Sequence, residues 1–237
     1  MSDRRFHGVE AVGVDGARAG WVACPSSGPI RLFASFESLV RNYPGSRFLV
    51  DIPQGLTNCE RDLESCIRAR LTGRTSSVFS VPSRRAVYAG SYEEACQLNL
   101  EAQGKKISLQ AWHICPKIRE VDRALQKTPS WQRRIFEAHP ELCFREISGR
   151  LLPTKKTREG QVERLRLLER FQPDLRQRFE TALKELPHKD AVPDDLLDAM
   201  VLSLIGSIGF AFLRGKVRRD EKGLAIRLAV PDTSYFA

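Results

Sequence analysis

The sequence predicts an α/β fold with a mixed sheet, in which an antiparallel three-strand meander precedes parallel strands. Apolar runs at about 9–15, 21–24 and 30–34 are separated by short turns, as consecutive antiparallel strands are. A continuous apolar run at 48–51 follows a short helical pattern, which is typical of a central parallel strand. A meander that a helix joins to a parallel strand is α/β in class.

The connections between these first elements contain strong turn residues. Gly16 to Gly20 forms the first turn, and the stretch from Ser26 to Pro29 (Ser-Ser-Gly-Pro) forms the second. A helix is expected from residue 35 or 36 to Asn42, and Pro44-Gly45 ends it.

After Pro53 the pattern is helical over a long stretch. Thr57-x-x-Glu60 is a capping box that predicts a helix ending near Gly73, and Ser91-x-x-Glu94 predicts another that ends at Gly104. A third helical pattern at about 107–126 is expected to be interrupted at Pro116. We therefore expect residues 1–237 to form a single domain with a mostly helical insertion at about 54–130.

The remaining elements complete the α/β order. They are expected to be a brief strand at 134–137, a helix from Pro140 to Gly149, amphipathic helices at about 161–171 and 173–186, an apolar helix from Pro193 to about 213, and a last strand at 223–230.

Composition and charge narrow the possible function classes. The chain has 237 residues, 42% of them hydrophobic, which is enough for one sizeable core. The net charge of +9 suits a polyanionic partner such as nucleic acid, and it equally fits a protein with solvated arginine-rich helices. No pair of the six cysteines has Cys-x-x-Cys spacing and the four histidines are scattered, which argues against zinc. Because the start, Met1 to Arg5, lacks an apolar leader, we expect a cytoplasmic protein with free thiols.

Two aspartates stand where strand-like runs stop. Asp15 follows Val12-Gly13-Val14, and Asp51 follows Phe48-Leu49-Val50. A carboxylate at the inner end of a buried strand is costly unless a positive charge meets it, and two in neighbouring strands would repel each other. A bound divalent cation resolves both problems, so the sequence predicts an acidic metal site.

Further acids are candidates for the same site. Glu137 ends a short strand, and Asp195 and Asp198 share one face of the long helix. Four carboxylates, one from each of three strands and one from the helix, would hold two Mg²⁺ or Mn²⁺ ions about 4 Å apart, since oxygen ligands suit these hard cations. The centre would contain one or two ions.

Each acid also has a structural interpretation. Asp15 could be a turn residue and Asp51 part of an Asx turn, while Asp194 and Asp195 could favour the helix N-terminus. Asp198 lies a full turn into the helix, where capping explains it poorly. Either Glu137 or Glu141 could face the site, and Glu137 is the expectation.

Several polar residues are candidates for substrate binding. Lys117, Lys155 or Lys156 could neutralise charge on phosphoryl oxygens. Arg74, Ser76 and Ser77 lie on a loop that could bind phosphate. His139 could shuttle a proton to a leaving group, although a histidine before proline is more often structural.

Seven motifs in order resemble one known family. They are Gly13-Val14-Asp15-Gly16 with Gly20-Trp21, Asp51-Ile52-Pro53-Gln54-Gly55-Leu56, Arg74-Thr75-Ser76-Ser77-Val78-Phe79 with Pro82, Pro116-Lys117-Ile118-x-Glu120-Val121-Asp122, Glu137-x-His139-Pro140-Glu141, Lys155-Lys156-Thr157-x-x-Gly160, and Asp194-Asp195-x-x-Asp198-Ala199. Over about residues 10–213 the chain resembles the family called domain of unknown function 429, whose members are described as predicted nucleases of ribonuclease-H-like fold.

The resemblance implies where the acids of such a centre would lie. A ribonuclease-H-like pattern expects acids on the first strand, at the end of the fourth strand and on a late helix, and Asp15, Asp51 and Asp198 (or Asp195) occupy these places. The expected function is therefore a metal-dependent nuclease that acts on nucleic acid or a nucleotide.

Two other classes of protein remain open. Asp15-Gly16 with Gly20 also resembles the first phosphate loop of actin-like ATPases, which would make the chain a phosphotransferase, although those enzymes need a second such loop. A non-catalytic nucleic-acid-binding module would need the basic residues and not the acids. A hydrolase of small molecules could use the same acids.

Overall fold

A computed structural model describes residues 9–213 and 217–235, and these divide into two compact units. The first, which we call the sheet unit, comprises Met1–Asp51, Arg133–Leu213 and Leu228–Ala237. The second, which we call the helical unit, comprises Ile52–Gln132 and Arg214–Arg227. The segment Met1 to Arg5, which was expected to lack an apolar leader, lies outside the described residues.

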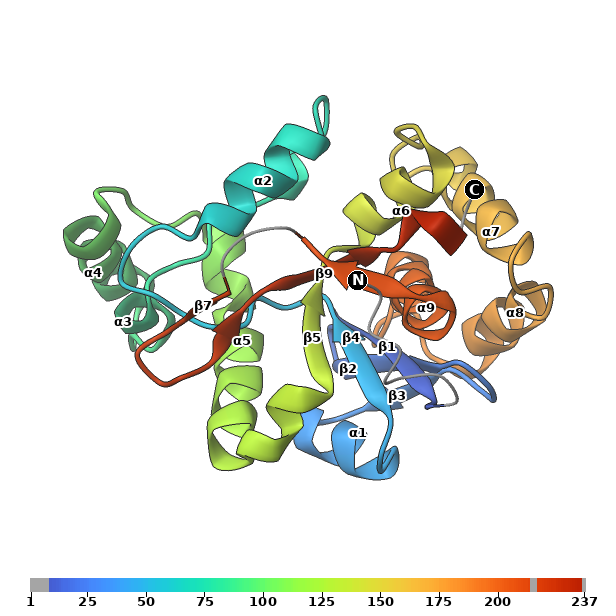
Figure 1. Cartoon of the computed structure of the whole chain (residues 1–237), viewed down its shortest axis with the longest axis horizontal. Helices are drawn as coiled ribbons and strands as arrows, with labels where there is room; N and C mark the ends of the chain where they lie inside the picture. The colour runs from blue at the N-terminus through green and yellow to red at the C-terminus, as the bar shows by residue number, and fades with distance from the viewer. Residues whose placement is uncertain (1–8, 214–216, 236–237) are drawn as a thin grey trace. The chain divides into compact units, whose positions relative to one another are not determined.

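The sheet unit is built on a seven-stranded mixed sheet of order β3-β2-β1-β4-β5-β9-β6 (Figure 1). Its strands are β1 (Ala11–Ala17), β2 (Gly20–Pro25), β3 (Arg31–Phe33), β4 (Arg47–Val50), β5 (Ile135–Ala138), β6 (Phe210–Phe212) and β9 (Leu228–Pro231). The first three form an antiparallel meander, and β1, β4, β5 and β9 are mutually parallel neighbours. This confirms the predicted α/β class and its ribonuclease-H-like strand arrangement, with β4 in a central, parallel position.

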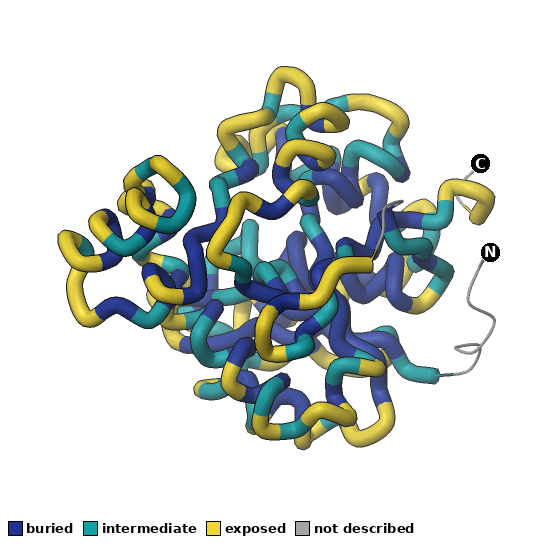
Figure 2. Tube along the Cα trace, turned by 60° about the vertical axis from the view of Figure 1, so that its left-hand side comes forward, coloured by how far each residue is buried: buried dark blue, intermediate teal, exposed yellow. Residues whose placement is uncertain are grey.

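Helices cover this sheet, and one of them, the apolar helix α9 (Pro193–Ile208), contacts both the sheet and most of the other helices of the unit. The helices of the sheet unit are α1 (Phe36–Asn42), α6 (Pro140–Ser148), α7 (Arg158–Glu169), α8 (Leu175–Glu185), α9 (Pro193–Ile208) and a short 3-10 helix, Thr233–Tyr235. The apolar α9 lies against β1, and α6, α7 and α8 pack around α9 (Figure 1). Buried segments line the interior of the unit, and exposed ones occupy turns and outer helix faces (Figure 2).

Strand alternation decides which side chains of the sheet face α9. Ala17 of β1 and Leu49 of β4 belong to the apolar cluster that contains the inner face of α9. Because side chains two positions apart in a strand share a face, Asp15 lies on the α9 side of the sheet. Asp51 follows Leu49 by two positions and is placed on the same side.

The helical unit has a smaller core of its own. Its elements are α2 (Asp62–Arg70), a 3-10 helix at Thr75–Ser77, α3 (Arg84–Val87), α4 (Tyr92–Gln103), α5 (Leu109–Lys127), a 3-10 helix at Pro129–Arg133 that ends at the unit boundary, and the short strands β7 (Arg218–Arg219) and β8 (Ala225–Ile226). Ala86, Ala95 and Ala111 bring α3, α4 and α5 into one apolar cluster. As predicted, Ser91 caps α4 and Gly104 ends it.

A buried arginine links α3 and α5 of this unit to the segment that carries β7 and β8. Arg84 forms ion pairs with Asp122 at 2.7 Å and with Asp220 at 2.6 Å, and both carboxylates are buried. Asp220 also accepts hydrogen bonds from the backbone N–H groups of Leu56 and Leu224. The two chain segments of the helical unit are thus joined through charged groups.

Two predictions about helices in this unit are wrong. The capping box at Thr57 does not form, because the Thr57 hydroxyl donates to the carbonyl of Cys59 and α2 begins only at Asp62. Pro116 does not interrupt the helix predicted at about 107–126, since α5 is a single helix of 19 residues that contains it. The exposed position of Pro116 leaves room for its ring on the outer face of the helix.

Two further boundaries differ in the last part of the chain. The apolar helix was expected to reach about residue 213, but α9 stops at Ile208 and β6 follows Gly209, whose φ of 157° is outside the helical region. The last predicted strand is divided at Arg227 into β8 and β9. In the described part of the chain, no helix combines the length and the apolar character needed to cross a bilayer. The six cysteines are free thiols.

Candidate metal centre

Asp15 lies near the end of β1, close to helix α9. A β-carbon at Gly13, two residues earlier on the same face, would meet Ala199 O at 1.9 Å, so the two backbones are in contact. The side chain of Asp15 bends back toward its own chain, where Oδ1 accepts the N–H of Gly16 at 2.7 Å. Asp15 is 9% exposed, so its carboxylate is largely removed from solvent.

Asp51 directly follows β4, the strand beside β1. Its backbone N–H donates to Val14 O at 3.0 Å, which continues the parallel ladder and brings Asp51 next to the Asp15 strand. Its carboxylate makes no hydrogen bond with any residue in 9–213 or 217–235. An unpartnered, partly buried carboxylate is costly, and a cation would offset this cost.

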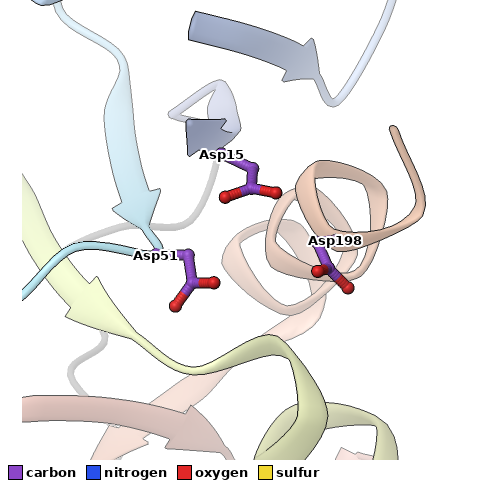
Figure 3. Close-up of side chains that lie close together, drawn as sticks. All are labelled: Asp15, Asp51 and Asp198. Carbon is purple, nitrogen blue, oxygen red and sulfur yellow. The ribbon is translucent and has the colours of Figure 1, made fainter. Parts of the chain in front are cut away.

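Asp198 supplies the third carboxylate from α9. It is 2% exposed, and the ammonium of Lys155 donates to its Oδ2. One oxygen each of Asp15, Asp51 and Asp198 can be chosen so that all three lie within 4.8 Å of one another. Figure 3 shows the three side chains converging from the end of β1, the end of β4 and α9.

The clustering of these acids favours their protonated forms. Burial raises the pKa of Asp15, and the charges of Asp51 and Asp198 raise it further. Burial and the charge of Asp198 raise the pKa of Asp51 to about 7. The pKa of Asp198 is also raised by burial, and Lys155 offsets part of this effect. A divalent cation would reverse the repulsion among all three carboxylates.

Among the predicted substrate-binding residues of the sheet unit, the structure places Lys155 at this centre. Burial lowers the pKa of Lys155, but the charges of Asp198 and Asp15 raise it by more, so the ammonium stays protonated. Its neighbour Lys156 is exposed to solvent. Of the two adjacent lysines that the sequence suggested as phosphate ligands, Lys155 is the one that contacts an acid of the centre.

The set of donors suits a hard cation. Three carboxylates from separate segments supply only oxygen atoms, which are the ligands that Mg²⁺, Mn²⁺ and Ca²⁺ prefer. The buried acidic triad could therefore hold a divalent metal ion.

Two other predicted acids lie near this group without joining it. Asp195 caps the start of α9, where its Oδ2 accepts the N–H of Val192 at 3.0 Å. Glu137 lies in β5 between Phe136 and Ala138, which both face α9, so strand alternation directs Glu137 to the other side of the sheet. Its charge still raises the pKa of Asp51. Catalytic roles for Asp195 and Glu137 stay predictions.

The segment after β5 has structural partners. Nδ1 of His139 accepts the N–H of Leu142 at 3.3 Å and so caps α6. Glu141 forms an ion pair of 2.7 Å with Arg164. Of Glu137 and Glu141, the two alternatives for a further acid at the site, Glu141 is thus paired with Arg164.

The remaining candidates belong to the helical unit. Lys117 lies in α5, Arg74 is the N-cap of the 3-10 helix Thr75–Ser77, and Ser76 and Ser77 lie in that helix. The hydroxyl of Ser77 donates to the carbonyl of Arg74 at 2.7 Å, and Ser76 is exposed. Their proposed contacts with substrate stay predictions.

Arg164 is a residue near the site that the sequence reasoning missed. Its side chain is completely buried in α7, where it binds the carbonyl oxygens of Pro153 and Gly160 as well as Glu141. Gly160, Arg164 and Leu168 share one face of the helix at four-residue spacing, and all three are buried. A charged residue at a core-facing position was the feature that could have revealed it.

Comparison with known proteins gives a family and no named relative. Neither the search of curated proteins nor that of solved structures found a match. One family model, described as "Protein of unknown function (DUF429)", matches residues 13–219 and so covers all three clustered aspartates. The chain therefore belongs to the DUF429 family of proteins of unknown function.

Proposed function

We propose that this protein is a divalent-metal-dependent nuclease, which hydrolyses phosphodiester bonds at the centre formed by Asp15, Asp51 and Asp198. One observation carries the proposal: carboxylates from β1, from the end of β4 and from α9 have oxygens within 4.8 Å of one another. Without a cation, three buried acids in mutual repulsion destabilise the fold. Their presence in one place is most simply explained by an ion that they hold.

The ion would be Mg²⁺ or Mn²⁺, and the three aspartates would be its ligands. Once bound, it would supply Lewis-acid activation of water and stabilisation of charge on the phosphoryl oxygens. In the overall reaction, the hydroxyl of water bonds to phosphorus, the bond from phosphorus to one ester oxygen breaks, and that oxygen leaves with the proton. Asp15, Asp51 and Asp198 fix the geometry, since two are held by the strand ladder and one by α9.

Nucleic acid is the substrate class that the charge of the chain favours. The net charge of +9 would attract a polyanion over distance, and exposed Lys156 follows the lysine at the centre. We also propose phosphate contacts for Lys117 and for the Arg74, Ser76 and Ser77 segment, and a proton-transfer role for His139. Glu137 and Asp195 are proposed as charges that tune the centre.

The proposal is tested by cleavage of end-labelled oligonucleotides, single-stranded and duplex, DNA and RNA, in the presence of Mn²⁺. We expect the wild-type protein to cut at least one of them and Asp51→Asn to lose the activity. Asp174→Asn, which changes an exposed aspartate of the same unit, should keep it.

A thermal melt of the same proteins gives a second measurement. Mn²⁺ should raise the melting temperature of the wild type and of Asp174→Asn, and not that of Asp51→Asn. Oligonucleotide binding that survives in Asp51→Asn, with no cleavage and no response to Mn²⁺ in the wild type, would instead favour a non-catalytic binding module.

A further inference from the structure

We propose that Lys155 occupies the position that a second cation takes in a two-ion centre, so that this centre binds a single divalent ion. The inference rests on the proposed function and decides the number of ions, which the sequence left at one or two. It is carried by the placement of the Lys155 ammonium and by the engagement of the neighbouring acids with other partners.

The ammonium of Lys155 is already inside the acidic group. It donates to Asp198 Oδ2, while the Lys155 side chain as a whole is 38% exposed. Its charge also acts on Asp15 and Asp51, because it opposes the rise in the pKa of both carboxyl groups. The charge of Lys155 thus acts on all three carboxylates, and its ammonium contacts Asp198.

The loop that carries Lys155 is fixed by a buried arginine. Arg164 binds the carbonyl oxygen of Pro153 at 2.6 Å, two residues before Lys155. At Gly160 a β-carbon would meet Thr154 O at 2.0 Å, so the loop lies directly on the start of α7. The Thr157 hydroxyl donates to the same Thr154 carbonyl at 2.9 Å. These contacts on both sides of Lys155 show that its position is built into the fold.

Three acids outside the triad have hydrogen-bond or ion-pair partners of their own. Asp195 accepts the N–H of Val192, and Asp194 accepts Nε2 of Gln161 at 3.0 Å. Glu141 is paired with Arg164. Among the residues that the structure describes, the group of ligands in mutual reach is limited to Asp15, Asp51 and Asp198.

The charges agree with one ion. A single divalent cation and one ammonium together carry three positive charges, which equal the three negative charges of the carboxylates. A second divalent ion would lie beside the like charge of the Lys155 ammonium, and this repulsion is strong where the dielectric is low.

Isothermal titration calorimetry with MnCl₂ tests the inference on the full chain. We expect one Mn²⁺ per chain for the wild type. Lys155→Met removes the competing charge and shortens the side chain by one atom, so it should bind Mn²⁺ about tenfold more tightly or better. Lys156→Met is the matched control, because the neighbouring lysine is exposed, and it should behave as the wild type.

Lys155→Arg keeps a positive charge and serves as the second variant in case Lys155→Met does not fold, which circular dichroism would reveal. It should bind one Mn²⁺ with an affinity near that of the wild type. Two Mn²⁺ ions in the wild type, or an unchanged or weaker affinity in folded Lys155→Met, would overturn the inference and leave the nuclease proposal standing. Failure of the wild type to bind Mn²⁺ at all would overturn both.

Discussion

Gly13 of β1 and Ala199 of α9 touch through their backbones, with only 1.9 Å between Ala199 O and the point where a β-carbon of Gly13 would lie. Two residues beyond Gly13 stands Asp15, and one residue before Ala199 stands Asp198. The close approach of strand and helix therefore sets how near these two carboxylates come.

Gly13→Ala should destabilise the protein and weaken its metal site together. The new methyl group would meet backbone atoms, which cannot turn aside as a side chain can, so α9 must move away from β1. We expect a loss of about 3 kcal/mol in the free energy of unfolding, at the upper end for overpacked cores, measured by urea denaturation. The melting-temperature rise on adding Mn²⁺ should shrink as well. Gly90→Ala is the control, because its β-carbon would meet only the end of the Glu94 side chain at 3.4 Å.

The stability of the metal-free protein should fall as the pH rises from about 4 to about 7. Asp51 has a folded-state pKa of about 7, above the ordinary value of 3.8, so the folded state holds a proton that the unfolded chain has released. Unfolding releases protons in this interval, and the free energy of unfolding therefore decreases with pH. Thermal melts in a chelator should show the decrease, and Asp51→Asn should flatten it.

Added Mn²⁺ should oppose this pH dependence, because the ion binds deprotonated carboxylates. Asp174→Asn should keep the slope of the wild type. An identical slope in Asp51→Asn and the wild type would show that Asp51 does not titrate as we expect.

Asp195 should prove to be mainly a capping residue. Asp195→Ala removes the acceptor for the Val192 N–H, and we expect a loss of about 1 kcal/mol in the free energy of unfolding. Asp195→Asn keeps an acceptor oxygen and should lose much less. Both variants should still bind Mn²⁺ in calorimetry with the same stoichiometry as the wild type. Loss of Mn²⁺ binding in Asp195→Asn would instead make Asp195 a ligand.

Arg84→Met should destabilise the helical unit strongly. It would leave the buried carboxylates of Asp122 and Asp220 without their shared cation, and breaking a buried pair in this way costs about 3 kcal/mol or more. The neighbouring Arg85→Met is the control, since Arg85 makes an exposed pair with Glu101 and its loss should cost less than about 1 kcal/mol. Hydrogen exchange of α3 and α5 amides would detect the difference. Equal protection in both variants would contradict the role of Arg84.

The main sheet and the central acids could be predicted because their determinants are local. Asp15 and Asp51 each end an apolar run, and such a run shows both the strand and the place where it stops. Asp198 could be separated from Asp194 and Asp195 because capping acts only within the first turn of a helix. The packing of α9 on β1 had to be known before one could say which carboxylate oxygens would lie close together.

Features that depend on distant contacts were not predictable. The Thr57 motif satisfied the local rule for a cap, but its hydroxyl found the Cys59 carbonyl instead. Phe210–Phe212 prolongs the apolar run of α9, and periodicity cannot separate a buried helix from a strand over so few residues. Arg164 resembles the other arginines of α7 until its partners at Glu141 and Pro153 are known.

The helical unit is assembled from two chain segments that residues 133–213 of the sheet unit separate, and this has a consequence for synthesis on the ribosome. When residues 52–132 emerge, Arg84 has Asp122 available but not Asp220, which is made only after α9. Domains generally fold in the order of their synthesis. The helical unit, however, cannot form the Arg84–Asp220 ion pair until the nascent chain is almost complete. A polypeptide released early, at the end of α9, would therefore carry an incomplete helical unit that chaperones and proteases can recognise.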